Sequence, residues 1–162
     1  MPNKPEKIDS FELGFKTAQS EIRFETAAFY YIYKNIQVNQ VIPNPACPTT
    51  CAGGNTFSNG PGAKGYGIDA DVTWTPVQDL NIHAGAEWLH ARYDHYPNAI
   101  GTGLSAASGF NSANQVQDWS GKQLARAPNF SANLGIDYTA PVAGGSLLMS
   151  ANVNYSTSYA IN

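Results

Sequence analysis

The segment that decides the fold is Tyr66-Gly67-Ile68-Asp69-Ala70-Asp71-Val72-Thr73-Trp74. Its large apolar side chains alternate with small or polar ones. This period of two is that of a β-strand, in which successive side chains point to opposite faces. The run also reaches the roughly 9 to 11 residues that a tilted strand needs to cross a bilayer. It therefore predicts a long strand with one apolar and one polar face.

The same alternation returns over residues 80–88, 130–138 and 147–155. Two earlier strands are expected over 11–16 and about 21–38, and the second of these is aromatic on both rows in its far half, so its register stays open. The strands fall into three consecutive pairs. The sequence thus predicts an all-β chain of about six antiparallel strands.

The connections between these strands alternate between short and long. Residues 17–20, 76–79 and 140–145 are brief polar or Pro/Gly links, whereas 39–62 and 97–124 are long segments expected to be irregular, since their Pro, Gly and Asn content breaks a strand ladder. Tight turns at one end and large loops at the other are typical of a bacterial outer-membrane barrel, with periplasmic turns and extracellular loops. The fold class predicted is a segment of an antiparallel transmembrane β-barrel, three hairpins long.

The alternation assigns each row of side chains to one environment. The apolar row is expected to face lipid and comprises Tyr66, Ile68, Val72, Trp74, Leu80, Ile82, Trp88, Leu134, Ile136, Leu147, Met149 and Val153. The polar row is expected to face a water-filled lumen and comprises Asp69, Asp71, His83, Glu87, Asn133, Asp137, Asn152 and Asn154.

Composition excludes several classes of protein. Only 13% of the residues are charged, against about 25% in ordinary soluble domains. No apolar run is long enough for a transmembrane helix. A net charge of −3 and a pI near 5.5 argue against a nucleic-acid partner. The start of the chain lacks the apolar segment of a signal peptide, so for an exported protein we expect the true N-terminus to lie elsewhere or to have been removed.

The two cysteines, Cys47 and Cys51, lie in a Pro- and Asn-rich part of the first long segment. In an oxidising compartment they could close a small disulfide ring, and the alternative is a pair of reduced thiols. A zinc site is disfavoured because no second cysteine pair or nearby histidine completes four ligands.

No arrangement of residues predicts catalysis. Residues 60–65 fit G-x-G-x-x-G, but a loop precedes them and a strand follows, whereas phosphate binding needs a helix N-terminus. Asp69, Asp71, Glu87 and His83 could form a metal or acid/base site, yet the wall of a water-filled lumen explains them as solvated groups. No nucleophile has a base placed beside it. We therefore predict no enzyme, no cofactor and no metal.

Four stretches together resemble a known family: Pro5–Lys16, Ala28–Val38, Ala63–Asp71 and Ala127–Tyr138. In order and spacing they are similar to the C-terminal part of the β-barrel of TonB-dependent outer-membrane receptors, across nearly the whole chain. The resemblance implies a barrel of about 22 strands around an N-terminal plug, and a domain 1–162 that is partial, without the plug and the final strands. It also implies outer-membrane lipid, the TonB complex and an extracellular ligand such as an iron–siderophore chelate as partners.

Ligand recognition is assigned to aromatic residues of the long loops, namely Phe57, Tyr96, Phe110 and Trp119. The alternative for each ring is that it only packs its loop. A second function class, a soluble β-sandwich for adhesion or carbohydrate binding, would need two sheets that bury the apolar rows against each other.

Overall fold

The computed structural model describes residues 3–42, 54–104, 109 and 111–161. Within them the regular structure consists of strands: β1 (Lys7–Ala18), β2 (Ile22–Lys34), β3 (Gln37–Ile42), β4 (Gly54–Asn59), β5 (Ala63–Val77), β6 (Leu80–Tyr93), β7 (Ala99–Leu104), β8 (Asn111–Gln117), β9 (Phe130–Val142) and β10 (Gly145–Ser156). A helix long and apolar enough to cross a membrane does not occur in these residues.

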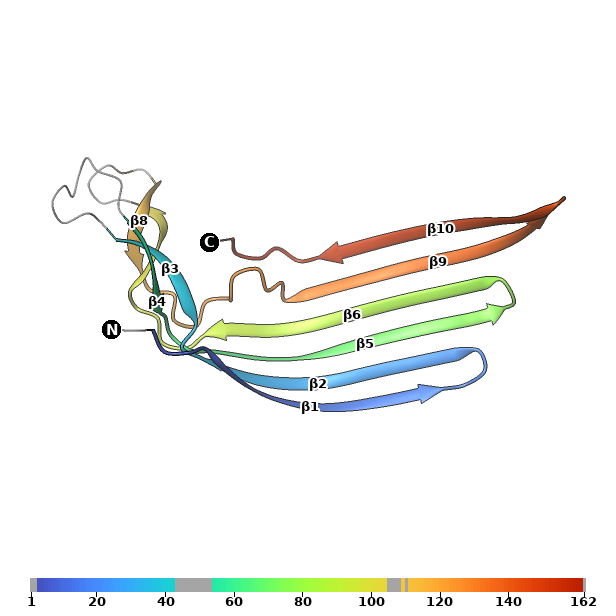
Figure 1. Ribbon diagram of the computed structural model, residues 1–162, viewed down its shortest axis with the longest axis horizontal. Coiled ribbons are helices and arrows are strands. Elements are labelled where there is room, and N and C mark those ends of the chain that lie inside the picture. The colour runs from blue at the N-terminus through green and yellow to red at the C-terminus, as the bar shows by residue number, and fades with distance from the viewer. Residues whose placement is uncertain (1–2, 43–53, 105–108, 110, 162) are drawn as a thin grey trace.

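Six long strands form one antiparallel sheet in the order β1-β2-β5-β6-β9-β10. Figure 1 shows them side by side, with tight turns at one end, called here the turn end. At the other end, the loop end, the hairpins β3–β4 and β7–β8 project from the sheet. The edge strands β1 and β10 each pair with a single neighbour, so the sheet is open. The prediction of an all-β chain with three hairpins, short turns and long loops is confirmed.

The strand register places the two rows of side chains on opposite faces of the six-stranded sheet. Ile68 lies opposite Trp88, while Asp69 lies opposite Glu87. The same alternation continues across β9, where Gly85 faces Asn133 and Trp88 faces Phe130. Because every pairing preserves the parity, one face is apolar and the other polar along the sheet. We call them the apolar face and the polar face.

The apolar face is not covered by a second layer in the described part of the chain. The exposed fractions of Ile68, Leu134 and Val153 are 51%, 47% and 66%, and no large side chain among these residues is fully buried. A soluble sandwich would bury these rows against a facing sheet. The sandwich alternative is therefore wrong for the described residues. An exposed apolar surface of this extent marks contact with another phase or partner.

The second strand ends earlier than predicted. β2 stops at Lys34, and Asn35 adopts a left-handed conformation with φ of 58°. This conformation leaves the strand ladder, and asparagine tolerates it better than most residues. The register of this strand, which the sequence left open, is given by the structure. Tyr30 lies opposite Tyr66 and so belongs to the apolar face.

The prediction that 39–62 and 97–124 are irregular is wrong in part. β3 pairs with β4, and β7 pairs with β8, each as an antiparallel hairpin. The reason is the placing of the ladder breakers. Residues 37–42 include Val38, Val41 and Ile42 and contain no proline, so they can pair, while Pro43, Pro45 and Pro48 come after them.

The turn end has the compact geometry that short connections need. Asp79 and Gly144 adopt positive φ angles of 74° and 89°, a conformation that favours Gly and, among other residues, Asn and Asp. Near the β5–β6 turn the register shifts between Trp74 and Val77. Pro76 lies at this irregularity, where its missing N–H costs no ladder hydrogen bond.

Candidate functional site

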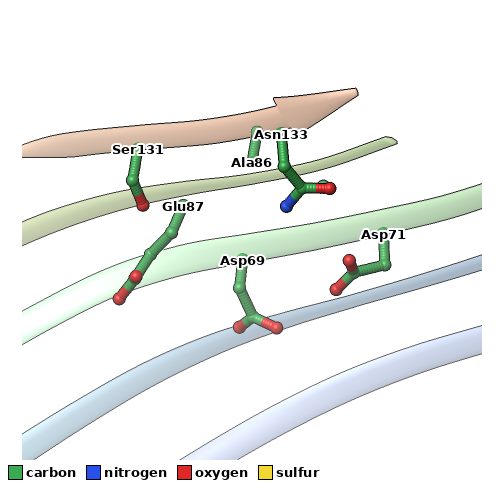
Figure 2. A pocket seen from close by; sticks show the side chains of 7 residues that line it. Asp69, Asp71, Ala86, Glu87, Ser131 and Asn133 are labelled. Carbon is green, nitrogen blue, oxygen red and sulfur yellow. The ribbon is translucent and has the colours of Figure 1, made fainter. Parts of the chain in front are cut away.

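The centre of the polar face is a shallow hollow of about 230 Å³. Its lining comes from three adjacent strands: Asp69 and Asp71 of β5, Gly85, Ala86 and Glu87 of β6, and Ser131 and Asn133 of β9. Figure 2 shows the labelled carboxylates and Asn133 gathered over these strands. The register brings them together, because Asp69, Glu87 and Ser131 form one row across the sheet and Asp71, Gly85 and Asn133 the next.

Gly85 makes the hollow possible. A Cβ atom at this position would lie 2.6 Å from Asp71 Oδ1 and 2.7 Å from Asn133 Nδ2, closer than carbon and a polar atom normally approach. A side chain here would therefore displace both flanking polar groups. The glycine in the middle of a polar row keeps their oxygen and nitrogen atoms within reach of one molecule or surface.

The hollow is acidic. Asp69, Asp71 and Glu87 make no ion pair within the described residues, whereas Lys16 and Glu25, which lie on β1 and β2 in the same row as Asp71, pair at 2.9 Å. No three His, Cys, Asp or Glu side chains of the described chain cluster tightly enough to hold a metal ion. The arrangement can hydrogen-bond water, a cationic surface or a hydroxylated solute, and it contains no nucleophile paired with a base.

His83 has a different partner from those considered in the sequence. It lies opposite Thr73 and Gly135, and its Nδ1 is 3.7 Å from Asp137 Oδ2. Ser150 donates a hydrogen bond of 2.6 Å to the other oxygen of Asp137. The His83 ring lies over Gly135, where an added Cβ would collide with it. The sequence placed His83 on the correct row but could not identify the partner, which comes from β9.

An aromatic pair on the polar face was not identified as a unit from the sequence. Phe29 and Tyr31 stack with ring centroids 6.4 Å apart and an interplanar angle of 10°. They lie over Gly67 and Gly65 of the neighbouring strand, at which Cβ atoms would overlap the rings. The pattern of two aromatic residues facing two glycines across paired strands becomes readable only once the register Phe29 to Gly67 is known.

A small core lies at the loop end. It contains the buried residues Ala63, Tyr93, Tyr96 and Ala99, with Tyr33, Ile36, Trp119 and Leu124 packed around them. The rings of Tyr93, Tyr96 and Trp119 contact one another with centroids 5.6 to 6.0 Å apart. This core joins the β7–β8 hairpin to the end of the sheet.

Two of the four aromatic residues assigned to ligand recognition belong to this core. Tyr96 is buried with an exposed fraction of 8%, and Trp119 is half-buried. Phe57 lies in β4, and nothing is described of its side chain. Phe110, Cys47 and Cys51 lie outside the described residues. In this structure the rings of Tyr96 and Trp119 pack the loop.

The turn that carries Trp119 is fixed by polar contacts. The Ser120 backbone N–H donates to Asp118 Oδ1 at 2.8 Å, and the Ser120 hydroxyl accepts a hydrogen bond of 2.8 Å from the Tyr96 backbone N–H. Hydrogen bonds from the side chain and backbone of Ser120 hold the pKa of Asp118 below its ordinary value. Both the ring and the backbone N–H of Tyr96 therefore make contacts that hold the loop end together.

A second polar link ties the chain before β1 to the β3–β4 hairpin. Glu6 accepts hydrogen bonds of 2.5 Å from the Tyr33 hydroxyl and from the Gln37 backbone N–H. These two bonds, of which the one from Tyr33 has the larger effect, hold the pKa of Glu6 below its ordinary value of 4.5. Asn59 of β4 adds two bonds with the backbone of Lys4. The base of the hairpin is thereby attached to the N-terminal segment.

Each of the two predicted rows occupies a single face of the sheet. The eight polar-row residues share the polar face, and the twelve apolar-row residues share the apolar face, as the pairings across β5, β6, β9 and β10 require.

Comparison with protein families gives a match over residues 1–162 to the family described as TonB dependent receptor-like, beta-barrel. The comparison with curated proteins finds no match.

The fold is similar to that of several solved structures. The ferric yersiniabactin uptake receptor FyuA from Yersinia pestis has a TM-score of 0.68 and 15% identity, over 97% of this chain and 19% of that one. The copper transporter OprC has a TM-score of 0.52 and 12% identity, over 85% and 16%. The alcaligin outer membrane receptor FauA from Bordetella pertussis has a TM-score of 0.50 and 24% identity, over 94% and 22%. The chain thus spans about a fifth of the length of these proteins.

Proposed function

Because the chain belongs to the TonB-dependent receptor β-barrel family, we propose that it forms part of the barrel wall of an outer-membrane transporter driven through TonB. The cargo is a scarce, bulky nutrient such as an iron–siderophore complex. The other parts of such a transporter, the plug and the segment that contacts TonB, would be supplied by chain other than residues 1–162.

One observation carries the proposal: six long strands present a continuous apolar face and a continuous polar face in a single layer. Hydrocarbon on the apolar side would keep water away from the apolar side chains that no second layer covers in the described residues. A strand ladder pairs the backbone groups that could not be left unpaired in lipid. The polar side then lines the lumen.

The polar face suits the wall of a transport path. Its acidic hollow has no counter-ion within the described residues and offers oxygen atoms to water, to a plug or to a passing solute. Nothing about it requires catalysis. The β3–β4 and β7–β8 hairpins, which project beyond the loop end (Figure 1), are where an external ligand would first make contact.

The cargo is proposed at the level of chemistry. The similar structures are described as a ferric yersiniabactin receptor, a copper transporter and an alcaligin receptor, which supports a metal-containing cargo. We place its recognition on the long hairpins, with Phe57 and Phe110 as the aromatic contacts and with Tyr96 and Trp119 contributing if the loop end rearranges on binding.

Two arginine substitutions in the full-length receptor test the membrane assignment. Ala70 lies on the apolar face halfway between Tyr66 and Trp74, and Asp71 lies next to it on the polar face. Ala70→Arg should cost about 2–4 kcal/mol of folding free energy in vesicles, because it places a cation near the bilayer midplane. Asp71→Arg should cost far less, because the new cation faces water and Glu25 across the strand pair. Equal costs for the two variants would show that the apolar face does not contact lipid.

The cargo is tested separately. A strain that lacks the receptor should lose uptake of one or more radioactive ferric chelates under iron starvation, and the restored gene should return it. Uptake that is unchanged for every ferric chelate would contradict the cargo and leave the membrane assignment to the arginine pair.

A further inference from the structure

The charged residues of the apolar face are confined to its loop end. Lys7, Lys34, Lys64 and Arg92, which we call the basic belt, share strand parity with Phe11, Tyr30, Tyr66 and Trp88. From those aromatic and apolar residues to the turn end, the rest of this face in β1, β2, β5, β6, β9 and β10 carries no Lys, Arg, Asp or Glu. This distribution is asymmetric along the strands, and solubility alone would not require it.

The register sets these cations directly opposite one another in pairs. Lys7 lies opposite Lys34, and Lys64 lies opposite Arg92. Like charges in directly opposed positions destabilise a strand pair unless an anion compensates them. Asp9 bridges the first pair with contacts of 3.0 Å to Lys7 and 3.1 Å to Lys34. Both lysines of the first pair therefore contact a carboxylate, although they share a single one.

The second pair is compensated only in part. Lys64 forms an ion pair of 3.2 Å with Asp94. Arg92 Nη1 donates to two neutral oxygens, the carbonyl of Ala91 at 3.0 Å and Asn129 Oδ1 at 3.2 Å, and it has no ion pair within the described residues. Four cations thus share two carboxylates. Each pair therefore keeps one positive charge in excess, and Arg92 is the cation of the belt that contacts no carboxylate of the described residues.

The belt lies one step beyond a cluster of rings. Tyr66 contacts Trp88 edge-on with centroids 5.8 Å apart and stacks on His90 at 4.9 Å. Amphipathic rings of this kind mark the level at which a bilayer's hydrocarbon meets its headgroups. Lys64 is two residues from Tyr66, about 7 Å further along the strand. That distance brings its ammonium group to headgroup depth.

We propose that the basic belt binds the phosphate groups of lipid headgroups in the leaflet next to the long hairpins, with Lys64 and Arg92 as the principal contacts. This inference rests on the membrane assignment made above. The side chains of Lys7, Lys34 and Lys64 are 65%, 52% and 51% exposed, so their ammonium groups are available. Lysine supplies a point charge, and the fork of an arginine fits two phosphate oxygens.

The position favours a lipid over a soluble anion. The belt is continuous with the apolar face, so a headgroup phosphate bound there would leave its acyl chains along Ile68 and its neighbours. A free anion has no acyl chains, so its binding would not be strengthened by contact with the apolar face. The charge and the apolar surface together match an amphiphile whose polar end is phosphorylated.

The test compares lipid binding by the full-length receptor in phosphatidylcholine nanodiscs with added bisphosphorylated lipid A or dephosphorylated lipid A. Lys64→Gln with Arg92→Gln should weaken binding of the phosphorylated lipid by about tenfold, since charge-assisted contacts are lost, and should leave the dephosphorylated lipid unaffected. The difference should shrink at high salt.

Two further variants keep the result interpretable. Lys64→Arg with Arg92→Lys retains both charges and should retain binding. Lys16→Gln with Arg23→Gln removes the same charges from the polar face and should also retain it. The proposal would be overturned if the wild type bound both forms of lipid A equally well, or if the Lys64→Gln/Arg92→Gln variant bound the phosphorylated form as tightly as the wild type. An equal loss of binding in the polar-face control would overturn it too. A receptor that fails to insert into nanodiscs would overturn the membrane assignment as well.

Discussion

Gly67 offers the sharpest test of how the sheet is packed. It lies in the interior of β5, and a Cβ atom added there would collide with the backbone carbonyl oxygen of Trp88 and come within 2.6 Å of Phe29 Cζ. A ring can turn aside, but a carbonyl oxygen in the strand ladder can move only with its strand. Gly67→Ala should therefore force β5 and β6 apart locally.

The magnitude follows from a matched control. Gly14 also lies in a strand, yet its added Cβ would have its nearest neighbours at 3.5 Å and 3.8 Å, which is ordinary contact. Both alanines restrict the unfolded chain and gain about 0.4–1 kcal/mol from that effect. Because this gain is common to both variants, the difference between them isolates the collision. Overpacking of this kind costs about 1–3 kcal/mol.

The assay is equilibrium unfolding by urea of the full-length receptor refolded into vesicles, followed by tryptophan fluorescence. We expect Gly67→Ala to be less stable than Gly14→Ala by about 1–3 kcal/mol, with a similar dependence on urea. If the two variants have equal stability, the close approach of β5 and β6 at this point is wrong.

Two other predictions concern the polar face and the loop end. Gly65→Ala should be destabilising because its Cβ would meet the Tyr31 ring, and Tyr31→Ala in the same chain should remove most of that penalty. A double-mutant cycle by urea unfolding measures this, and additive effects would show that the ring does not lie over the glycine. At Glu6 the lowered pKa means that its hydrogen bonds stabilise the hairpin base above the ordinary value of 4.5 and are lost as the pH falls through the folded-state pKa. Wild type should therefore protect the Gln37 amide from hydrogen exchange better than Glu6→Gln at neutral pH, and protection that differs equally at low pH would contradict the role of the charged carboxylate.

Local sequence was sufficient for the strands of the sheet and for their faces. The alternation over 66–74 states which residues share a side, since the pleat fixes it without reference to any other strand. For the same reason the acidic residues of the hollow could be placed on one face in advance. The core at the loop end and the glycine contacts could not be predicted, because each joins residues of different strands, and a period of two does not change when one strand slips by two residues along its neighbour.

The long hairpins β3–β4 and β7–β8 show where an inference from composition was wrong. Composition suggested irregular segments, and the structure contains β3–β4 and β7–β8. A count of prolines and glycines averages over a segment, whereas pairing depends on where those residues stand. In the first segment the prolines follow Ile42, so β3 is free to pair.

What the sequence determined by itself is the two-sided character of each long strand, because a period of two acts within a single strand. What only the tertiary structure decided is which hairpins lie side by side and the offset at which neighbouring strands pair. That offset sets Lys64 against Arg92, Phe29 over Gly67 and Asp69 beside Glu87. Contacts across a sheet depend on register, and register is fixed by all the pairings together.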